Sequence, residues 1–327
     1  MRGFDEYSNE MFRLYNEKKY SEALQVVVQA AKEFPDNTAR TTFWIACLEC
    51  RMGNTRGALE ALEKGLQRGV WWNEDTFRDP DLDPIRNTAE LARILKECQR
   101  RRQELRNPEK PDLVFHSPLG ASRGESFPVI IVLHQRYGEK PTETVRPWSS
   151  ILQKGVGLAV PWSSQIFAPD GRCWDNLEVA ERDVTWVYSQ VREQKGVDKS
   201  KIVLAGFSQG AALAIYLSLK KAFPCKGFFA VAPSDWVMPE KQRAIERDRP
   251  SRAYLEFVQS TDARGVRGQI LIGEKDPFLK KMEFLKEEMV RRGLECNYSV
   301  EPRIGHEYPQ DFGGKLRKAV NFVLEMS

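Results

Sequence analysis

The segment around Ser208 constrains the fold of this chain more than any other feature. A buried-strand sequence, KIVLAGF at residues 201–207, runs directly into Ser208-Gln209-Gly210, and a helical sequence, AALAIYLSLKKAF, follows. A serine between two glycines at a strand-to-helix junction is typical of a nucleophile elbow, a strained turn that lifts the hydroxyl above a sheet. A surface loop is the alternative, but the flanking strand and helix favour the elbow.

A histidine downstream of Ser208 is expected to act as its base, because a serine hydroxyl is a weak nucleophile at neutral pH. In folds built around such an elbow the chain order is serine, acid, histidine. The chain has three histidines, and only His306 follows the serine. It lies in SVEPRIGHEYP, where an alternating strand gives way to a glycine-containing loop. The sequence therefore predicts His306 as the base, with a surface histidine as the alternative.

The acid that orients this base should follow the strand between the two residues. Asp276 does so, because it comes after the apolar run ILIG and a short turn in QILIGEKDPF. Glu274 precedes the turn, and three other acids lack an apolar strand directly before them: Asp235, Asp248 and Asp262. The predicted triad is Ser208, Asp276 and His306.

Short apolar segments, separated by helical ones such as LEVAERDVTWVYSQVREQ, recur from residue 112 onwards. They are DLVFH, PVIIVLH, GLAVPW, KIVLAGF, GFFAVAP, QILIG and NYSVEP. This alternation predicts an α/β fold with a mostly parallel sheet and helices on both faces. Ligands of such sheets bind at the carboxyl ends of the strands.

These segments resemble the phospholipase/carboxylesterase group of α/β-hydrolases, which includes acyl-protein thioesterases and small bacterial esterases. The resemblance spans about residues 112–327 and rests on PVIIVLHQRYG, SSQIFAPDGRCWDNLEVAERDV, VLAGFSQGAALA, ILIGEKDPF and IGHEYP, all in the family's order. It implies an α/β-hydrolase fold and hydrolysis of an acyl ester or thioester through an acyl-enzyme, with no cofactor and no metal.

The oxyanion hole departs from the family's pattern. It needs two backbone N–H groups, one of them from the residue after the nucleophile, here Gln209. The family usually takes the other from a loop that begins His-Gly, whereas this chain reads Leu133-His134-Gln135-Arg136. By position the second donor is Arg136. Gln135 is the alternative, because a side chain at position 135 restricts the loop.

The substrate pocket is expected to draw on four residues near the same edge of the sheet: His134, Trp162, Trp174 and Trp236. Trp162 and Trp174 also fit ordinary packing, and His134 also fits a residue that merely closes a strand. Residues 234–268 are longer than a simple crossover requires. They fit a mobile lid or a plain surface helix equally well.

Composition narrows the class of protein. The 327 residues, 41% of them hydrophobic, suggest about two domains. No apolar run is long enough to span a bilayer and the first residues begin no secretory signal, so we expect a cytoplasmic enzyme. Six cysteines lack a disulfide framework. Cys47 and Cys50 form a CxxC in a helical sequence without a second pair, which favours inert helix cysteines over a zinc site.

The charge balance argues against nucleic acid as a partner. The formal net charge is +4, from 50 basic and 46 acidic residues. The basic run Arg100-Arg101-Arg102 lies opposite an apolar helix face, so a solvated stripe is favoured over a phosphate-binding or partner-binding patch.

The region before residue 105 has a helical period and a repeat. YSEALQVVVQAAKEFPDN and TRGALEALEKGLQRGVWWN align at a shift of 35 residues, which pairs Ala23 with Ala58, Leu24 with Leu59, Val27 with Leu62 and Ala30 with Gly65. This pattern resembles tetratricopeptide repeats, with an unrelated helical bundle as the alternative. We predict a small all-α helical-repeat domain at 1–106, a proline-containing linker at 107–111 and the catalytic domain at 112–327.

The sequence thus predicts a carboxylesterase-type serine hydrolase (EC 3.1.1) that acts on a small-molecule acyl ester. A peptidase or an acyl-protein thioesterase with the same triad is an alternative, because these substrates share one tetrahedral intermediate. A helical-repeat adaptor whose hydrolase domain mainly binds a partner is an alternative from another class. A protein partner or a homo-oligomer formed through the N-terminal helices stays open, as does the acyl chain length.

Overall fold

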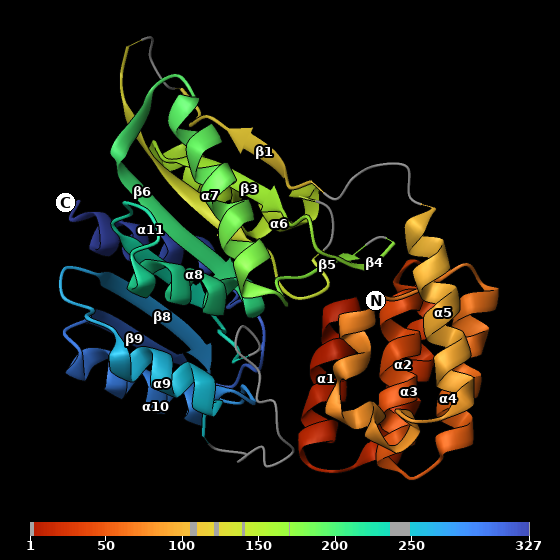
Figure 1. Ribbon diagram of the computed structural model, residues 1–327. Helices are drawn as coiled ribbons and strands as arrows, with labels where there is room; N and C mark the ends of the chain where they lie inside the picture. Colours follow the sequence, from red (N-terminus) through yellow and green to blue (C-terminus); the bar gives the residue numbers. More distant parts are fainter. Residues whose placement is uncertain are drawn as a thin grey trace. The chain divides into compact units, whose positions relative to one another are not determined.

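The computed structural model describes residues 3–104, 110–120, 124–138, 141–169, 171–235 and 249–326 (Figure 1). The chain forms two compact units. One comprises Met1–Glu109 with Ile166–Gly171, and the other comprises Lys110–Gln165 with Arg172–Ser327. The predicted domain limits stay a prediction, since residues 107–109 of the expected linker lie outside the described residues.

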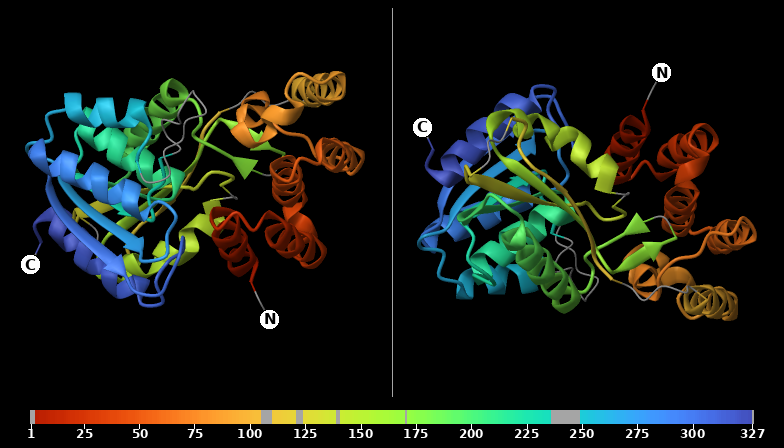
Figure 2. Two further views of the ribbon diagram at one scale, coloured as in Figure 1. Left: turned by 90° about the horizontal axis from the view of Figure 1, so that it is seen from below. Right: turned by 90° about the horizontal axis from the view of Figure 1, so that it is seen from above.

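The N-terminal unit is helical, and Figure 2 views several of its helices nearly along their axes. Its described α-helices are α1 (Phe4–Asn16), α2 (Tyr20–Glu33), α3 (Thr38–Arg51), α4 (Thr55–Gln67) and α5 (Ala89–Gln103). The positions that the repeat aligns have similar burial. Ala23 and Ala58 are both buried, and so are Val27 and Leu62. The two segments therefore bury equivalent faces, while the tetratricopeptide-like interpretation stays a prediction.

A short hairpin that the sequence did not predict lies mostly in this unit, which includes Ile166–Gly171. It pairs β4 (Ile166–Ala168) with β5 (Gly171–Arg172). The Phe167 ring packs edge-on against Phe43 with 6.1 Å between the ring centroids, and the Asn73 backbone N–H donates to the Phe167 carbonyl at 2.9 Å. Strands this short carry no hydrophobic period, so no sequence pattern announces them.

The second unit is built on a sheet in which the described strands follow the order β1-β3-β2-β6-β7-β8-β9. The strands are β1 (Asp112–His116), β2 (Phe127–Leu133), β3 (Gly157–Trp162), β6 (Val197–Phe207), β7 (Gly227–Val231), β8 (Arg267–Gly273) and β9 (Glu295–Glu301). Edge strand β1 runs antiparallel to β3, and all other neighbours are parallel. The predicted, mostly parallel sheet is confirmed.

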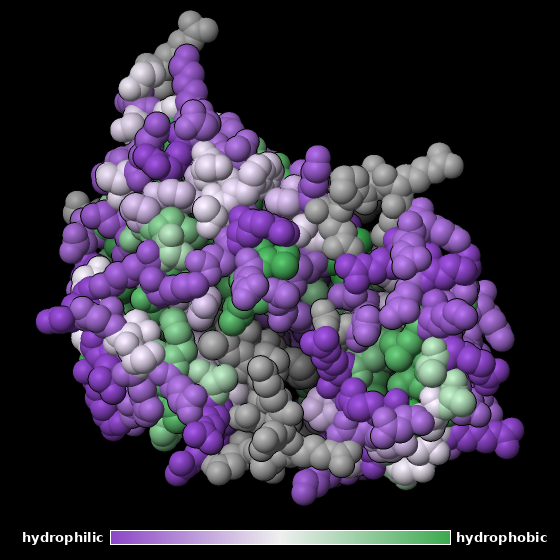
Figure 3. Space-filling view, viewed as in Figure 1, coloured by the Kyte–Doolittle hydropathy of each residue, from purple (hydrophilic) through white to green (hydrophobic). Residues whose placement is uncertain are grey.

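Alternate residues of the central strands enter two separate cores. Val129 and Ile131 of β2 belong to a core that also contains residues of α7 (Leu177–Glu193), α8 (Gln209–Lys220), α9 (Arg252–Ser260) and α10 (Leu279–Arg291). Ile130 and Val132 face the opposite core, which contains residues of α6 (Pro141–Trp148) and α11 (Phe312–Leu324). Helices therefore cover both faces, as predicted. Figure 3 shows that hydrophilic residues dominate the outer surface in the view of Figure 1.

The parallel strands bring the predicted site residues to one edge of the sheet. Arg136 follows β2, Ser208 follows β6, Asp276 follows β8 and His306 follows β9. These strands are parallel, so their carboxyl ends lie at the same edge.

Candidate active site

The backbone at Ser208 has the strain expected of a nucleophile elbow. Ser208 has φ 55° and ψ −116°, a combination that L-residues rarely adopt. A Cβ at Gly210 would lie 2.1 Å from the Leu133 carbonyl oxygen, and a Cβ at Gly206 would lie 2.5 Å from the Gly210 carbonyl carbon. Both glycines are therefore required by close backbone packing, which lets the turn seat against the end of β2.

The side chains of Ser208, His306 and Asp276 form one hydrogen-bonded chain. His306 Nε2 lies 2.9 Å from Ser208 Oγ, and His306 Nδ1 lies 2.8 Å from Asp276 Oδ2. A carboxylate only accepts, so Nδ1 carries the proton and Nε2 presents its lone pair to the serine hydroxyl. The structure thus brings together the three residues that the sequence singled out.

Local contacts hold the acid and the base in place. The Asp276 side chain is fully buried, and its Oδ1 accepts from the Phe278 backbone N–H at 2.8 Å. A Cβ at Gly273, the last residue of β8, would lie 2.2 Å from the Gly305 carbonyl oxygen. The loop that carries His306 is therefore packed directly on the end of β8.

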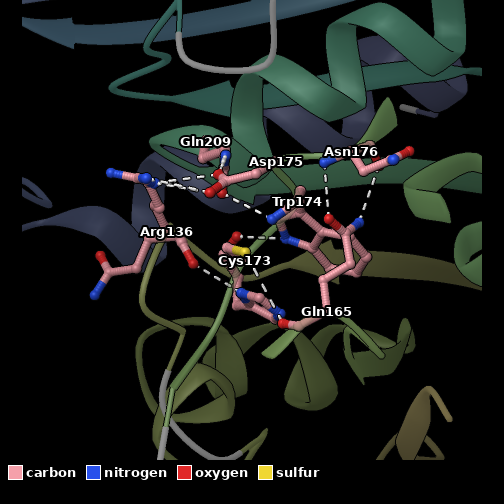
Figure 4. Close-up of polar contacts among 9 residues, drawn as sticks. Arg136, Gln165, Cys173, Trp174, Asp175, Asn176 and Gln209 are labelled. Carbon is pink, nitrogen blue, oxygen red and sulfur yellow. Dashed lines mark hydrogen bonds and ion pairs between the residues drawn. The ribbon is translucent and has the colours of Figure 1, made fainter. Parts of the chain in front are cut away.

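The two principal candidates for the oxyanion hole also lie at this edge. Gln209 is the first residue of α8, where a backbone N–H has no acceptor within the helix. Arg136 lies in the turn after β2, and its neighbour Tyr137 has a left-handed φ of 60°. Both side chains contact Asp175 (Figure 4). Gln135, the alternative donor, precedes Arg136 in the same turn.

Two of the residues predicted to line the pocket are buried in the structure. His134 is 1% exposed and Trp174 is 0% exposed, and their rings stack with centroids 4.6 Å apart. The Ser163 backbone N–H donates to His134 Nε2 at 3.2 Å, so the proton is on Nδ1, which donates to the Gln135 carbonyl at 2.7 Å. Neither side chain offers surface to a substrate.

The other two residues predicted to line the pocket are Trp162 and Trp236. Trp162 is half-buried; its indole N–H donates to the Gly138 carbonyl at 3.1 Å, and the Arg172 guanidinium lies 4.2 Å from its ring centroid. Trp236 lies outside the described residues.

Burial keeps His134 neutral. It lowers the pKa of His134 from the ordinary 6.5 to about 4, against the raising effect of the hydrogen bond to Gln135. His134 is therefore uncharged at physiological pH.

The described part of residues 234–268 includes a helix packed on the core. Tyr254 of α9 is buried, and its hydroxyl donates to the Ala212 carbonyl of α8 at 3.3 Å. Residues 236–248 of the segment that we considered as a lid lie outside the described residues.

Two acids near the site make contacts that the sequence did not indicate: Asp175, and Asp235, which was considered above only as the acid that orients the base. Asp175 lies directly after Trp174, and the signal that could have found it is Arg136 in the turn after β2, because its charge calls for a counter-charge. Asp235 forms an ion pair of 2.8 Å with Lys281, and both side chains are largely buried. Asp235 follows Ser234, whose backbone N–H donates to the Ser208 carbonyl at 3.3 Å.

One grouping in the N-terminal unit has the residue types of a metal site. One ligand atom each of Cys47, Asp79 and Asp81 lies within 4.8 Å of the others. The Asp81 carboxylate already accepts from the Tyr15 hydroxyl at 2.8 Å and lies 3.2 Å from Arg51 Nε. Tyr15 and Arg51 therefore already occupy the oxygens of this carboxylate.

Within the described residues, no helix combines the length and the apolar character needed to cross a membrane.

Solved structures share this architecture. An uncharacterized protein from Bacillus cereus ATCC 10987 is 21% identical over the whole of both chains, with a TM-score of 0.50. Esterase PE8 is 17% identical and covers 67% of this chain and 100% of its own, with a TM-score of 0.51. An S-formylglutathione hydrolase from Agrobacterium tumefaciens is 18% identical and covers 64% of this chain and 89% of its own, with a TM-score of 0.50. No curated protein matches the chain. At these identities the likeness shows the fold.

The chain therefore has an α/β-hydrolase fold preceded by a helical domain, as predicted. Residues 188–245 match the sequence model of the Phospholipase/Carboxylesterase family, and residues 4–106 match that of the A/B hydrolase-like N-terminal domain. The predicted resemblance to the phospholipase/carboxylesterase family of α/β-hydrolases is confirmed.

Proposed function

We propose that this protein is a serine hydrolase that cleaves carboxylic acyl esters through an acyl-enzyme. The observation that carries the proposal is the hydrogen-bonded chain from Ser208 through His306 to Asp276, with distances of 2.9 and 2.8 Å. The family match supports it, as do the names of two proteins with the same fold, an esterase and an S-formylglutathione hydrolase.

Acylation begins when Ser208 Oγ attacks the carbonyl carbon of the ester. His306 Nε2 takes the hydroxyl proton as the carbon–oxygen bond forms, and Asp276 stabilises the imidazolium through its bond to Nδ1. His306 then gives the proton to the leaving alcohol or thiol as the bond to the leaving group breaks. The product of this half-reaction is an acyl ester on Ser208.

Deacylation repeats the same steps with water. His306 removes a proton from water, the resulting hydroxide attacks the acyl carbon, and the proton returns to Ser208 Oγ as the free acid leaves. In both halves the carbonyl oxygen becomes an oxyanion. We assign its stabilisation to the backbone N–H groups of Gln209 and Arg136.

The buried rings of His134 and Trp174 support the turn after β2, which carries Arg136. We therefore do not include them in the proposed substrate pocket. Trp162 is the predicted pocket residue whose described side chain keeps some exposed surface. Its role in binding stays part of the proposal.

Labelling with a fluorophosphonate, followed by turnover of p-nitrophenyl esters of increasing acyl length, tests the proposal. Ser208→Ala should abolish labelling and lower kcat by roughly three to six orders of magnitude, because triad members act as a unit. Ser189→Ala, which changes an exposed serine of α7, is the matched control and should behave as wild type. Retention of a tenth of the activity in Ser208→Ala would exclude Ser208 as the nucleophile.

A second panel of substrates tests which leaving group the enzyme accepts. Oxygen esters, thioesters and peptide anilides of one acyl group share the tetrahedral intermediate, so the ratio of their kcat/KM values separates esterase from thioesterase and peptidase activity. Binding of a partner without turnover of any of them would favour the adaptor function.

A cytoplasmic location and a partner for the N-terminal helices are further parts of the proposal. Six cysteines scattered through the sequence without a disulfide framework support a reducing compartment: Cys47, Cys50, Cys98, Cys173, Cys225 and Cys296. Cell fractionation tests the location, and light scattering of the full chain tests the association through the N-terminal helices.

A further inference from the structure

The side chain of Asp175 joins the two residues to which we assign the oxyanion hole. Its carboxylate accepts from Arg136 Nε at 3.1 Å and from Arg136 Nη2 at 3.1 Å. It also accepts from Gln209 Nε2 at 2.7 Å. Figure 4 shows the three side chains converging from the turn after β2, the loop before α7 and the start of α8.

The contacts of Gln209 and Trp174 close this arrangement into a ring. Gln209 Oε1 accepts from the Trp174 backbone N–H at 3.0 Å, and the Trp174 indole N–H donates to the His134 carbonyl at 2.9 Å (Figure 4). The chain then runs from His134 to Arg136, which returns to Asp175. The backbone on both sides of the oxyanion position is therefore linked through buried polar side chains.

The charge of Asp175 makes the ring strong. Burial raises the pKa of Asp175, but the Arg136 charge and hydrogen bonds from Arg136, Gln209 and Cys173 outweigh it and hold the pKa below its ordinary value. The carboxylate is ionised at neutral pH and its bonds to Arg136 are charge-assisted. The side chains of Arg136 and Asp175 are only 20% and 16% exposed, so solvent screens the pair less than it screens a surface pair.

The turn after β2 needs such support, because one of its residues has an unfavourable backbone conformation. Tyr137 has a φ of 60°, which is unfavourable for a residue with a side chain. A strained turn keeps one conformation only where surrounding contacts impose it.

We propose that Asp175 is a positioning residue for the oxyanion hole: its carboxylate fixes the turn that carries the Arg136 N–H against the helix start that carries the Gln209 N–H. This inference rests on the proposed function. Asp175 does not touch the substrate, and its effect reaches the reaction through the backbone of residues 136 and 209.

The effect should appear in kcat rather than KM, because negative charge develops on the carbonyl oxygen only after the substrate is bound, on the way to the tetrahedral intermediate. Loss of a whole oxyanion donor typically lowers kcat by about 10²–10³. Asp175→Ala keeps both N–H groups but loosens their spacing, so we expect kcat to fall about 10- to 100-fold with KM within about threefold. The pH dependence of kcat/KM should keep the wild-type shape, since the His306–Asp276 pair is untouched.

Asp183→Asn is the matched control. Asp183 is a buried acid of α7 that accepts from the Ser164 backbone N–H at 2.8 Å and from the hydroxyl groups of Ser163 and Ser164. It should lower the melting temperature and leave kcat within about threefold. If Asp175→Ala fails to fold, the isosteric Asp175→Asn takes its place, because it removes the charge and an acceptor while preserving volume.

A double-mutant cycle with Arg136→Ala, which retains the backbone N–H, tests the route. The two losses in kcat should be less than additive if Asp175 acts through Arg136. A folded Asp175 variant with kcat within twofold of wild type, a loss confined to KM, or a changed pH profile would each overturn the inference. A wild-type protein that neither reacts with fluorophosphonate nor hydrolyses any ester would instead overturn the proposed function.

Discussion

Burial of neutral His134 makes the stability of this protein depend on pH in a predictable direction. The unfolded chain takes up a proton on His134 as the pH falls through its ordinary pKa of 6.5, whereas the folded protein does so only near a pKa of about 4. Protons therefore favour the unfolded state between these values. The stabilising contribution is complete above about pH 7 and is lost as the pH falls from 6.5 to 4, to a total of about 3 kcal/mol.

The variant His134→Gln isolates this effect, because it removes the titrating group. We expect the free energy of unfolding of wild type to fall by about 2 kcal/mol more than that of the variant between pH 8 and pH 5. Urea unfolding followed by tryptophan fluorescence measures both curves, and the His134 ring resonances in NMR should show no titration above pH 5. Parallel curves for the two proteins, or a His134 resonance that titrates near 6.5, would refute the reasoning.

Three further substitutions test other parts of the structure. Asp276→Asn should lower kcat by about 10⁴-fold in the ester assay with little change in melting temperature, because an amide no longer fixes the His306 tautomer. Gly210→Ala should destabilise the fold by about 1–3 kcal/mol and impair labelling by fluorophosphonate, since its Cβ would lie 2.1 Å from the Leu133 carbonyl oxygen. Its control, Gly314→Ala in the exposed part of α11, should be neutral or stabilising in urea unfolding. Phe167→Ala should cost about 3–5 kcal/mol in the stability of the N-terminal unit, measured by the same method, because the ring is 4% exposed and packs on Phe43.

The sheet could be predicted from sequence because each parallel strand is a short apolar run with a clear end. The β6 prediction began at Lys201 and ended at Phe207, and the structure extends the strand back to Val197 while keeping its end. The end of the strand matters for the site, because it determines where Ser208 stands. The hairpin at 166–172 was missed for the opposite reason, since its two strands are too short to show a period.

The sequence could single out Ser208, Asp276 and His306 as a candidate triad, because chain order and position after a strand left one histidine and one acid. The residues that line the pocket could not be singled out in this way. The sequence indicates that an aromatic residue lies at the edge of the sheet, but it does not indicate which way the ring points. Trp174 illustrates this: its ring lies under the turn at His134, with no surface to a substrate.

The Asp175 network shows a different limit of the sequence pattern. Arg136 and Asp175 are 39 positions apart in the sequence. Residues of one helix turn or one hairpin are much closer together, so no periodic pattern relates this pair. They meet because the turn after β2 and the loop before α7 both reach the first turn of α8, where Gln209 also contacts Asp175. An arginine in the turn after β2 nevertheless carries information, since a partly buried guanidinium requires a counter-charge. The search for that counter-charge can be limited to acids that precede helices at the same sheet edge, and in this chain Asp175, one residue before the Asn176 cap of α7, meets that condition.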